Sequence, residues 1–350
     1  MNTFPDLKQC GKGIILLLYA TSTFFFPAQA QQAQMHAQQQ SQQAPLHSNA
    51  HLGFLYPLST NGRQAAQYSN AFSFHLLMGL SKEETAFVLS GISTVIKERA
   101  AGVQFAGVSN HVGHRTEGIQ FAGLYNHTGQ HLQGFQFAGA MNYAGKTAGF
   151  QFAGVLNRAL DVDGFQFAGL INKARRVKGM QFAGLINIAD SSDYPLGVLN
   201  FIKQGEKSIG ISTDELFNFL LSFRSGGRVL YGIVDVGYNL KSKEQLYAFG
   251  GGLGVHLALS DTFRLNAELK TLMLEDFHRG EYVRYSLNIL PAWKLSERIE
   301  VFAGPSLNFA DTDMAEGKAL FRNPLWEKAY RPNGSRMGYV GGSAGMHFLL

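Results

Sequence analysis

The most regular pattern in the chain is a short motif that recurs between residues 102 and 187. Apolar and polar positions alternate within it, so that in the first copy Val103 and Phe105 point to one face while Gln104 and Ala106 point to the other. Each copy begins with Gly and ends with Asn, which are residues typical of turns. The alternation with a period of two therefore predicts a β-strand between turns.

Six near-identical copies of this motif follow one another at a spacing of 15 or 16 residues. Degenerate copies extend the array at both ends, at Phe87–Thr94 and at Leu196–Asn200. A fixed period with atypical terminal copies predicts an array in which each unit packs only on its neighbours. The repeat signature consists of Gln104, Gly107, Asn110, Gln120, Gly123, Asn126, Gln136, Gly139, Asn142, Gln151, Gly154, Asn157, Gln166, Gly169, Asn172, Gln181, Gly184 and Asn187.

Two all-β architectures fit a unit of this length. In a solenoid-like stack each unit is one coil, and identical residues lie about 4.8 Å apart; in a meander each unit is a hairpin. Every copy keeps the same residue at the same place while the polar return segments between copies vary, which favours the stack. The strands are too short to span a bilayer. We expect the Phe residues to form a core ladder, with each Gln and Asn paired to its equivalent in the next unit.

The C-terminal region, residues 205–350, predicts an antiparallel β-barrel or β-sheet domain of about eight strands. Many of these strands have about ten residues, as in the smallest outer-membrane barrels, and a soluble periplasmic sheet domain is the alternative. The last residue, Leu350, departs from the aromatic terminus usual in such barrels. The predicted strands are Ser208–Thr213, Leu216–Phe223, Val229–Tyr238, Leu246–Leu259, Thr262–Leu274, Tyr282–Leu290, Glu300–Phe309 and Met337–Leu350.

The N-terminus carries the pattern of a secretory signal. Residues 1–30 combine Lys8 and Lys12, an apolar run and an Ala-Gln-Ala end, which predicts cleavage after Ala30. The single cysteine, Cys10, would leave with it. Residues 31–50 are rich in Gln and Ala and predict a disordered leader. We assign residues 51–85 to an N-terminal cap, and 86–204 to the β-repeat domain.

Composition narrows the function classes. The 350 residues are 45% hydrophobic and 16% charged, with 40 Gly and a net charge of +5. This content of apolar residues excludes a wholly disordered chain. The absence of a long basic run gives no support to nucleic acid as a partner.

The repeat unit resembles that of bacterial surface-repeat proteins with tandem G-h-Q-h-(A/G)-G-h-h-N units, where h is an apolar residue. The resemblance covers residues 86–200. It implies export across the inner membrane, an outer-membrane or surface location and an outer-membrane β-barrel-like C-terminal region, and it implies no activity. The Ala before the Gly departs from copies that carry a bulkier residue there.

No catalytic motif is found. The glycine-rich stretch Gly250–Val255 lies within a strand pattern and lacks the Lys-Ser/Thr of a phosphate loop, and the Glu83–Glu84 pair is typical of a surface. The one set of metal-ligating residue types with a regular spacing is histidine, because stacking would bring equivalent positions of adjacent units close together. This metal-site hypothesis names His111, His114, His127 and His131.

The sequence therefore predicts an exported, non-enzymatic β protein of the outer membrane or cell surface, with the periplasm as the alternative location. It would act as a structural scaffold or a channel-like barrel with a repeat array. The second hypothesis is a secreted adhesin or binding module that uses the variable return segments as its recognition face. Outer-membrane lipid is the expected partner, together with an unidentified surface ligand or protein, and no cofactor is expected.

Overall fold

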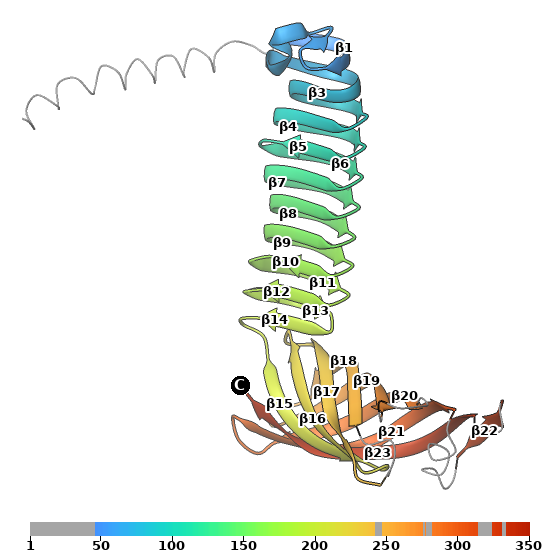
Figure 1. The fold of residues 1–350 in the computed structure, drawn as a ribbon. Coiled ribbons are helices and arrows are strands. Elements are labelled where there is room, and N and C mark those ends of the chain that lie inside the picture. The colour runs from blue at the N-terminus through green and yellow to red at the C-terminus, as the bar shows by residue number, and fades with distance from the viewer. Residues whose placement is uncertain (1–45, 242–246, 276, 278–281, 314–323, 331–333) are drawn as a thin grey trace, which may run out of the picture. The chain divides into compact units, whose positions relative to one another are not determined.

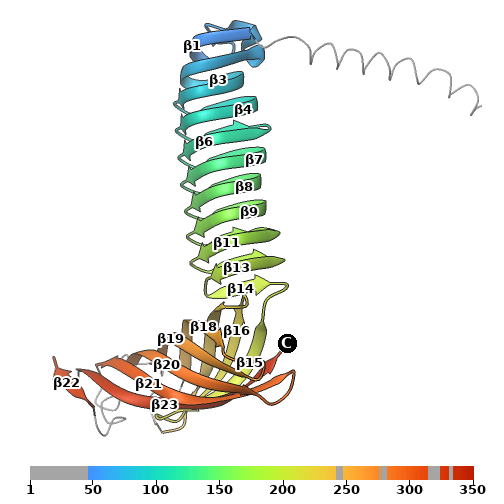
Figure 2. The same ribbon diagram turned by 180° about the vertical axis from the view of Figure 1, so that it is seen from behind.

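The computed structural model describes residues 46–241, 247–275, 277, 282–313, 324–330 and 334–350, so the predicted signal peptide and residues 31–45 of the predicted leader lie outside it. Within the unit Ser48–Leu350, a parallel β-solenoid of about eight turns is followed by a closed antiparallel β-barrel of eight strands (Figures 1 and 2). The predicted fold class is confirmed. Of the two arrangements considered for the repeats, the solenoid is the one present.

The repeats stack in register. Gln120 pairs with Gln136 and Phe121 with Phe137 in parallel strands, and the next pair of coils repeats the pattern one unit further along. The last strand of the solenoid ends at Ile202, and the first strand of the barrel begins at Lys207.

Two short strands and a 3-10 helix form the N-terminal cap, namely β1 (Leu46–Leu55), β2 (Leu58–Ser59) and η1 (Gly62–Gln67). Residues 46–50, predicted to belong to the disordered leader, lie in β1, so that prediction was wrong for these residues. The coils consist of β3 (Tyr68–Ser90), β4 (Ser93–Ala106), β5 (Ser109–Val112), β6 (Arg115–Ala122), β7 (Tyr125–Ala138), β8 (Met141–Ala153), β9 (Leu156–Ala168), β10 (Ile171–Lys173), β11 (Arg176–Ala183), β12 (Ile186–Ala189), β13 (Ser191–Leu196) and β14 (Leu199–Ile202).

Amide side chains line the interior of the solenoid, where the signature Gln and Asn residues are buried. Gln136 Nε2 donates to Gln120 Oε1 over 2.7 Å, and Gln151 Nε2 donates to Gln136 Oε1 over 2.9 Å. Asn126 Nδ2 donates to Asn142 Oδ1 over 3.0 Å, and the same contact recurs along the stack. The predicted pairing of each Gln and Asn with its equivalent is confirmed, because an amide group can both donate and accept.

The Phe residues lie outside this core, so the prediction of a buried Phe ladder was wrong. Phe105 is 36% exposed and Phe167 is 45% exposed. The ladder itself exists, because the rings of Phe135 and Phe150 are nearly parallel with centroids 4.9 Å apart. The face that carries the Ala and amide side chains therefore lies inside the coil. It can be buried because each amide has a hydrogen-bond partner in a neighbouring coil.

Two sets of glycines permit this close stacking, for different reasons. A Cβ on Gly123 would collide with the carbonyl oxygen of Gly107 in the coil before it, and the same holds for Gly139 against Gly123. The Gly that begins each motif instead adopts a backbone conformation that L side chains rarely take, with a φ of +133° at Gly134.

Both ends of the solenoid are covered. The cap strands β1 and β2 continue the sheet beyond β3. At the other end, the backbone N–H of Asn200 donates to Ser225 Oγ over 3.0 Å, and Asn200 Nδ2 donates to the carbonyl oxygen of Ser225 over 3.1 Å. The amide ladder thus ends on a strand of the barrel.

The barrel closes by pairing its first strand with its last. All eight strands predicted from the sequence are confirmed, whereas the short β22 was not predicted. The strands are β15 (Lys207–Asp214), β16 (Asn218–Gly226), β17 (Leu230–Asn239), β18 (Tyr247–Ala258), β19 (Phe263–Glu275), β20 (Tyr282–Lys294), β21 (Ile299–Thr312) and β23 (Ser335–Leu349), with β22 (Trp326–Ala329) paired to β23.

The amide ladder predicts a large difference between two Gln-to-Ala substitutions in β7. Gln136→Ala leaves the amide of Gln151 without its acceptor, and we expect it to lower the free energy of unfolding of the solenoid by about 2–4 kcal/mol. Gln133→Ala changes an exposed residue of the same strand, and a change within about 0.5 kcal/mol is expected. Pulse proteolysis in urea measures both values, and equal effects of the two substitutions would show that the ladder is not a main source of stability.

Candidate functional site

The barrel interior holds many polar and charged side chains beside a buried apolar cluster that includes Leu220, Leu272 and Met337, and the barrel exterior is apolar. Along β20, Arg284, Ser286 and Asn288 point inward and are buried, whereas Tyr285 and Leu287 point outward and are 50% and 46% exposed. A water-soluble barrel has the opposite polarity. The alternation of inward polar and outward apolar residues is typical of barrels that face lipid.

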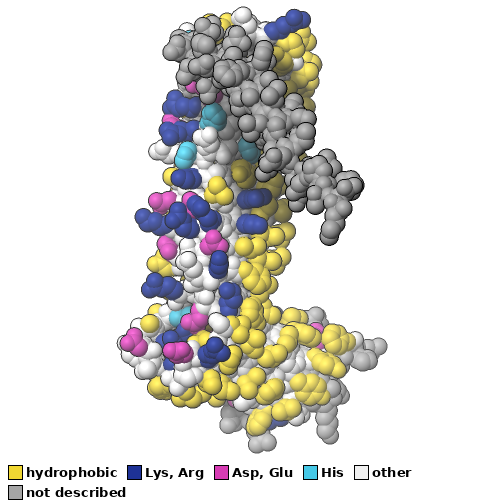
Figure 3. Space-filling model, turned by 90° about the vertical axis from the view of Figure 1, so that its left-hand side faces the viewer, with side chains coloured by type: hydrophobic (Ala, Val, Ile, Leu, Met, Phe, Trp, Pro, Cys, Tyr) yellow, Lys and Arg dark blue, Asp and Glu magenta, His cyan; other side chains and the backbone are white. Residues whose placement is uncertain are grey.

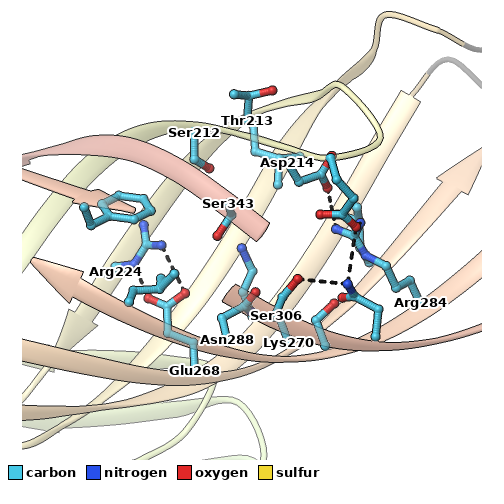
Figure 4. Close-up of a pocket in the computed structure, with 17 residues that line it drawn as sticks. Ser212, Thr213, Asp214, Arg224, Glu268, Lys270, Arg284, Asn288, Ser306 and Ser343 are labelled. Atoms are coloured by element: carbon cyan, nitrogen blue, oxygen red, sulfur yellow. Dashed lines mark hydrogen bonds and ion pairs between the residues drawn. The ribbon is translucent and has the colours of Figure 1, made fainter. Parts of the chain in front are cut away.

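Ion pairs fill the interior of the barrel (Figure 4). Arg224 Nε donates to Glu268 Oε1 over 2.9 Å, and the hydroxyl of Tyr231 donates to the same oxygen over 3.0 Å. Lys270 Nζ lies 2.6 Å from Asp235 Oδ2. Buried pairs of this kind add little net stability, but losing one partner leaves an uncompensated charge.

Two further cations complete the network. Arg284 Nη2 lies 2.6 Å from Asp214 Oδ2, near one end of the barrel. Near the other end, Arg264 Nε lies 2.6 Å from Glu300 Oε2 and its Nη2 lies 2.7 Å from Glu206 Oε1. The network therefore joins residues from strands on opposite sides of the barrel.

These side chains leave little open volume. The cavity that they enclose between Ser212, Arg224, Lys270 and Asn308 measures about 20 Å³, which is room for roughly one water molecule. A hydrated ion does not fit into a space of this size. The interior, as far as the described residues define it, is packed rather than hollow.

Aromatic side chains gather at both ends of the outer wall. At the end of the barrel that meets the solenoid, which we call the solenoid end, Phe263 lies opposite Trp293. At the other end, the loop end, Phe219 lies opposite Tyr238, and Tyr238 lies opposite Tyr247. Tyr285 and Phe309 form another such pair at the loop end.

The wall between the two aromatic rings is aliphatic. Leu269 faces Leu287, and Leu287 faces Leu307, with exposed fractions of 61%, 46% and 56%. Among the described residues, the outward positions between the rings include no Asp, Glu, Lys or Arg. An uncharged band bordered by two aromatic girdles is typical of the surface of an outer-membrane barrel.

The solenoid also has an apolar side, and Figure 3 shows hydrophobic side chains along one side of it and charged ones along another. We call this surface the apolar face, and it consists of three columns of outward side chains. The first column consists of Val103, Ile119, Phe135, Phe150, Phe165 and Met180. The second column consists of Leu89, Phe105, Phe121, Phe137, Phe152, Phe167 and Phe182. The third column consists of Ile92, Val108, Leu124, Ala140, Val155, Leu170, Leu185 and Val198.

The variable return segments line a groove on the solenoid, which we call the return groove. Its volume is about 580 Å³, and its walls include Arg115, Lys146, Asp163 and Lys178. This volume is within the range of ligand-binding clefts. Charges of both signs line the groove, so it offers ion pairs and hydrogen bonds to a polar ligand.

The structure brings together part of the predicted histidine set. His111 and His127 are register partners with ring centroids 6.1 Å apart, as the stacking predicted. Burial lowers the pKa of both. His131 instead pairs with Arg115, and its backbone N–H donates to the carbonyl oxygen of His114. In the described part of the chain, no three His, Cys, Asp or Glu side chains form a group that could hold a metal.

A buried polar cluster lies beneath the cap. Glu84, which the sequence suggested was a surface residue, is 1% exposed, and it accepts hydrogen bonds from Asn70 and Ser73 over 3.1 and 2.8 Å. Burial raises the pKa of Glu84 to about 7. His75 Nε2 lies 3.2 Å from His51 Nδ1, and burial together with His51 lowers the pKa of His75 to about 4.

Sequence reasoning missed the charged residues inside the barrel. Their signal was the alternation in strands such as Tyr282–Lys294, where Arg, Ser and Asn occupy every second position between large apolar residues. The strand pattern was enough to count the strands, but it did not by itself assign Arg224, Glu268 or Arg284 to the interior.

Comparison with protein-family models, with curated proteins and with solved structures finds no match to this chain. The resemblance of the repeat unit to bacterial surface-repeat proteins therefore stays a prediction. None of the helices in the described ranges is long and apolar enough to cross a membrane.

The raised pKa of Glu84 predicts a pH-dependent gain from Glu84→Gln. The wild-type carboxyl is protonated when folded below about pH 7 but ionises near 4.5 when unfolded, so its contribution to stability is complete below pH 4.5 and is lost as the pH rises to about 7. We expect the variant to match the wild type at pH 4.5 and to exceed it by up to about 3 kcal/mol at pH 8. Pulse proteolysis of the cap at both pH values measures the difference, and a constant difference would contradict burial of the carboxyl.

Proposed function

We propose that the protein is a non-enzymatic scaffold of the outer membrane, in which the barrel crosses the bilayer as an anchor and carries the solenoid. The observation that supports this most directly is the inverted polarity of the barrel. Its outward face combines an uncharged aliphatic band with two aromatic rings, and its charges are buried inside.

The dimensions of the strands agree with this proposal. From Tyr285 to Trp293 at opposite ends of β20 there are eight residue steps, or about 26 Å along the strand. A spanning β-strand needs about 9–11 residues with a tilt near 45°. The nine residues from Tyr285 to Trp293 thus lie at the short end of the range for a spanning strand, as suits a thin bilayer such as the outer membrane.

The packed interior favours an anchor over a channel. A conducting barrel needs a continuous aqueous path, whereas the Arg224–Glu268 and Arg284–Asp214 pairs occupy the space where the path would run. An eight-stranded barrel has an interior just wide enough for side chains to fill.

The connections between strands indicate which side of the membrane holds the solenoid. At the solenoid end the turns are short and span residues 227–229, 259–262 and 295–298. At the loop end one connection, residues 215–217, is equally short, but the other three are longer and span residues 240–246, 276–281 and 313–334, the last of which includes β22. Outer-membrane barrels have short turns on the periplasmic side and longer loops outside, so we place the solenoid in the periplasm.

Membrane insertion predicts that a charge in the middle of the outer band is costly. Leu269, 61% exposed, lies at the centre of β19, and Leu269→Arg should destabilise the barrel in phospholipid vesicles by about 2–4 kcal/mol. Leu295→Arg introduces the same charge at a leucine that is 67% exposed in a turn and should cost about 1 kcal/mol or less.

Urea unfolding followed by the fluorescence of Trp293 and Trp326 measures both variants in the barrel itself. A soluble periplasmic domain would tolerate the two substitutions equally and would fold without lipid or detergent. That result would contradict the proposal and support the alternative location.

The return groove supports a second candidate function, a binding module whose variable return segments contact a polar ligand. If the groove acts as a surface adhesin, it must be accessible from outside the cell. Lys146 is exposed in the groove, so Lys146→Cys in intact cells distinguishes the two candidates. For a periplasmic solenoid we expect labelling by a membrane-impermeant maleimide only after the outer membrane is permeabilised, and labelling of intact cells would favour the adhesin.

A further inference from the structure

We propose that the apolar face of the solenoid is the contact surface between two copies of this chain. The face has no charged residue in any of its three columns, and no other described part of the chain covers its exposed members. The inference does not depend on membrane insertion, because the face belongs to the solenoid alone.

The size of the face requires a partner. Its exposed members retain between 36% (Phe105) and 55% (Leu124) of their surface, or roughly 60–100 Å² each. Over the length of the stack these values sum to on the order of 1,000 Å². The largest apolar patch of a typical monomer is about 300–600 Å², whereas a stable interface buries about 800 Å² on each partner.

The shape of the face fits a copy of itself. Phe150 stacks on Phe135 at 4.9 Å and on Phe165 at 5.0 Å, each with an interplanar angle of 3°. The columns are therefore straight ridges with the spacing of the strands. A second sheet with the same distance between strands can place its side chains between these ridges, with the two sheets about 10 Å apart. A second copy of this chain presents the same distance between strands along its whole solenoid.

The symmetry of such a pair is closed. A two-fold axis brings one patch of each copy against the same patch of the other, so the contact ends with two copies and does not grow into a fibre. If the axis runs along the stack, every coil faces its own equivalent, and the second column faces itself while the first faces the third. If it runs across the face, each column faces itself, but only the central coil faces its own equivalent.

Cysteine cross-linking can test this contact. The one cysteine of the chain, Cys10, lies in the predicted signal peptide, so an introduced cysteine would be the only thiol of the processed protein. In the processed full-length protein, Phe137→Cys places a thiol in the second column at the middle of the stack, at a partly exposed site that lies close to its own equivalent for either axis. We expect a disulfide-linked dimer on mild oxidation in both micelles and membranes. Phe105→Cys, near one end of the same column and 36% exposed, should cross-link as well if the axis runs along the stack. Failure of both variants to cross-link would contradict the proposal.

Two controls separate this contact from others. Lys146→Cys in the return groove should give no dimer above background. Phe165→Glu places a charge in the face, and in sedimentation equilibrium it should weaken the dimer by about tenfold or more, which corresponds to about 1.4 kcal/mol. A dimer that survives Phe165→Glu unchanged would be held by the barrel and would contradict the proposal.

Other occupants of the face would give different results. A monomeric protein in which the thiol of the Phe137→Cys variant reacts freely with a water-soluble maleimide in micelles but not in membranes would assign the face to acyl chains. A monomer that shows cross-links from Phe137→Cys only to other proteins in the membrane would assign the face to a different partner. Either result would overturn the proposal.

Discussion

The hydrogen bonds between amide side chains of successive coils are the interaction on which the rest of the solenoid depends. A buried Gln or Asn is costly unless its donors and acceptors are paired, and here each is paired only if its neighbour sits one coil away in the same register. A slip of one residue would break the amide contacts along the stack and turn the Phe columns inward. The ladder thereby fixes the register that sets both the glycine contacts between coils and the straightness of the apolar face.

The solenoid and the barrel share one feature, in that both bury many polar side chains and expose many large apolar ones. In the solenoid the interior holds neutral amides in continuous rows, and in the barrel it holds ion pairs such as Arg224–Glu268. Both interiors also contain apolar clusters, such as that of Leu220 and Leu272 in the barrel and that of Val162 and Val177 in the solenoid, and the directional polar contacts add geometric specificity to this packing. Both exteriors then need an apolar environment, which lipid supplies for the barrel in our proposal and a second copy supplies for the solenoid.

The sequence was sufficient to predict the strands and the repeat register, because alternation and turn residues are local signals. It was not sufficient to assign the inside of the coil. Alternation places Phe105 and Gln104 on opposite faces, but the usual rule that apolar residues are buried selects the wrong face here. The location of Glu84 was missed for a similar reason, since its burial depends on Asn70 and Ser73, which are distant in sequence. The cap strand at residues 46–50 was missed because its residues gain order only by pairing with the rest of the sheet.

The contact between Asn200 and Ser225 has a consequence for how the molecule could change over evolution. Because the two ends of the stack are closed by different structures, a whole coil inserted or removed between them would leave both ends intact. Each inserted or removed coil would change the distance between the cap and the barrel by about 4.8 Å. The amide ladder would gain or lose one Gln and one Asn and would otherwise stay the same. The number of repeats thus sets the distance between the cap and the barrel, so this distance changes in fixed steps with the length of the gene.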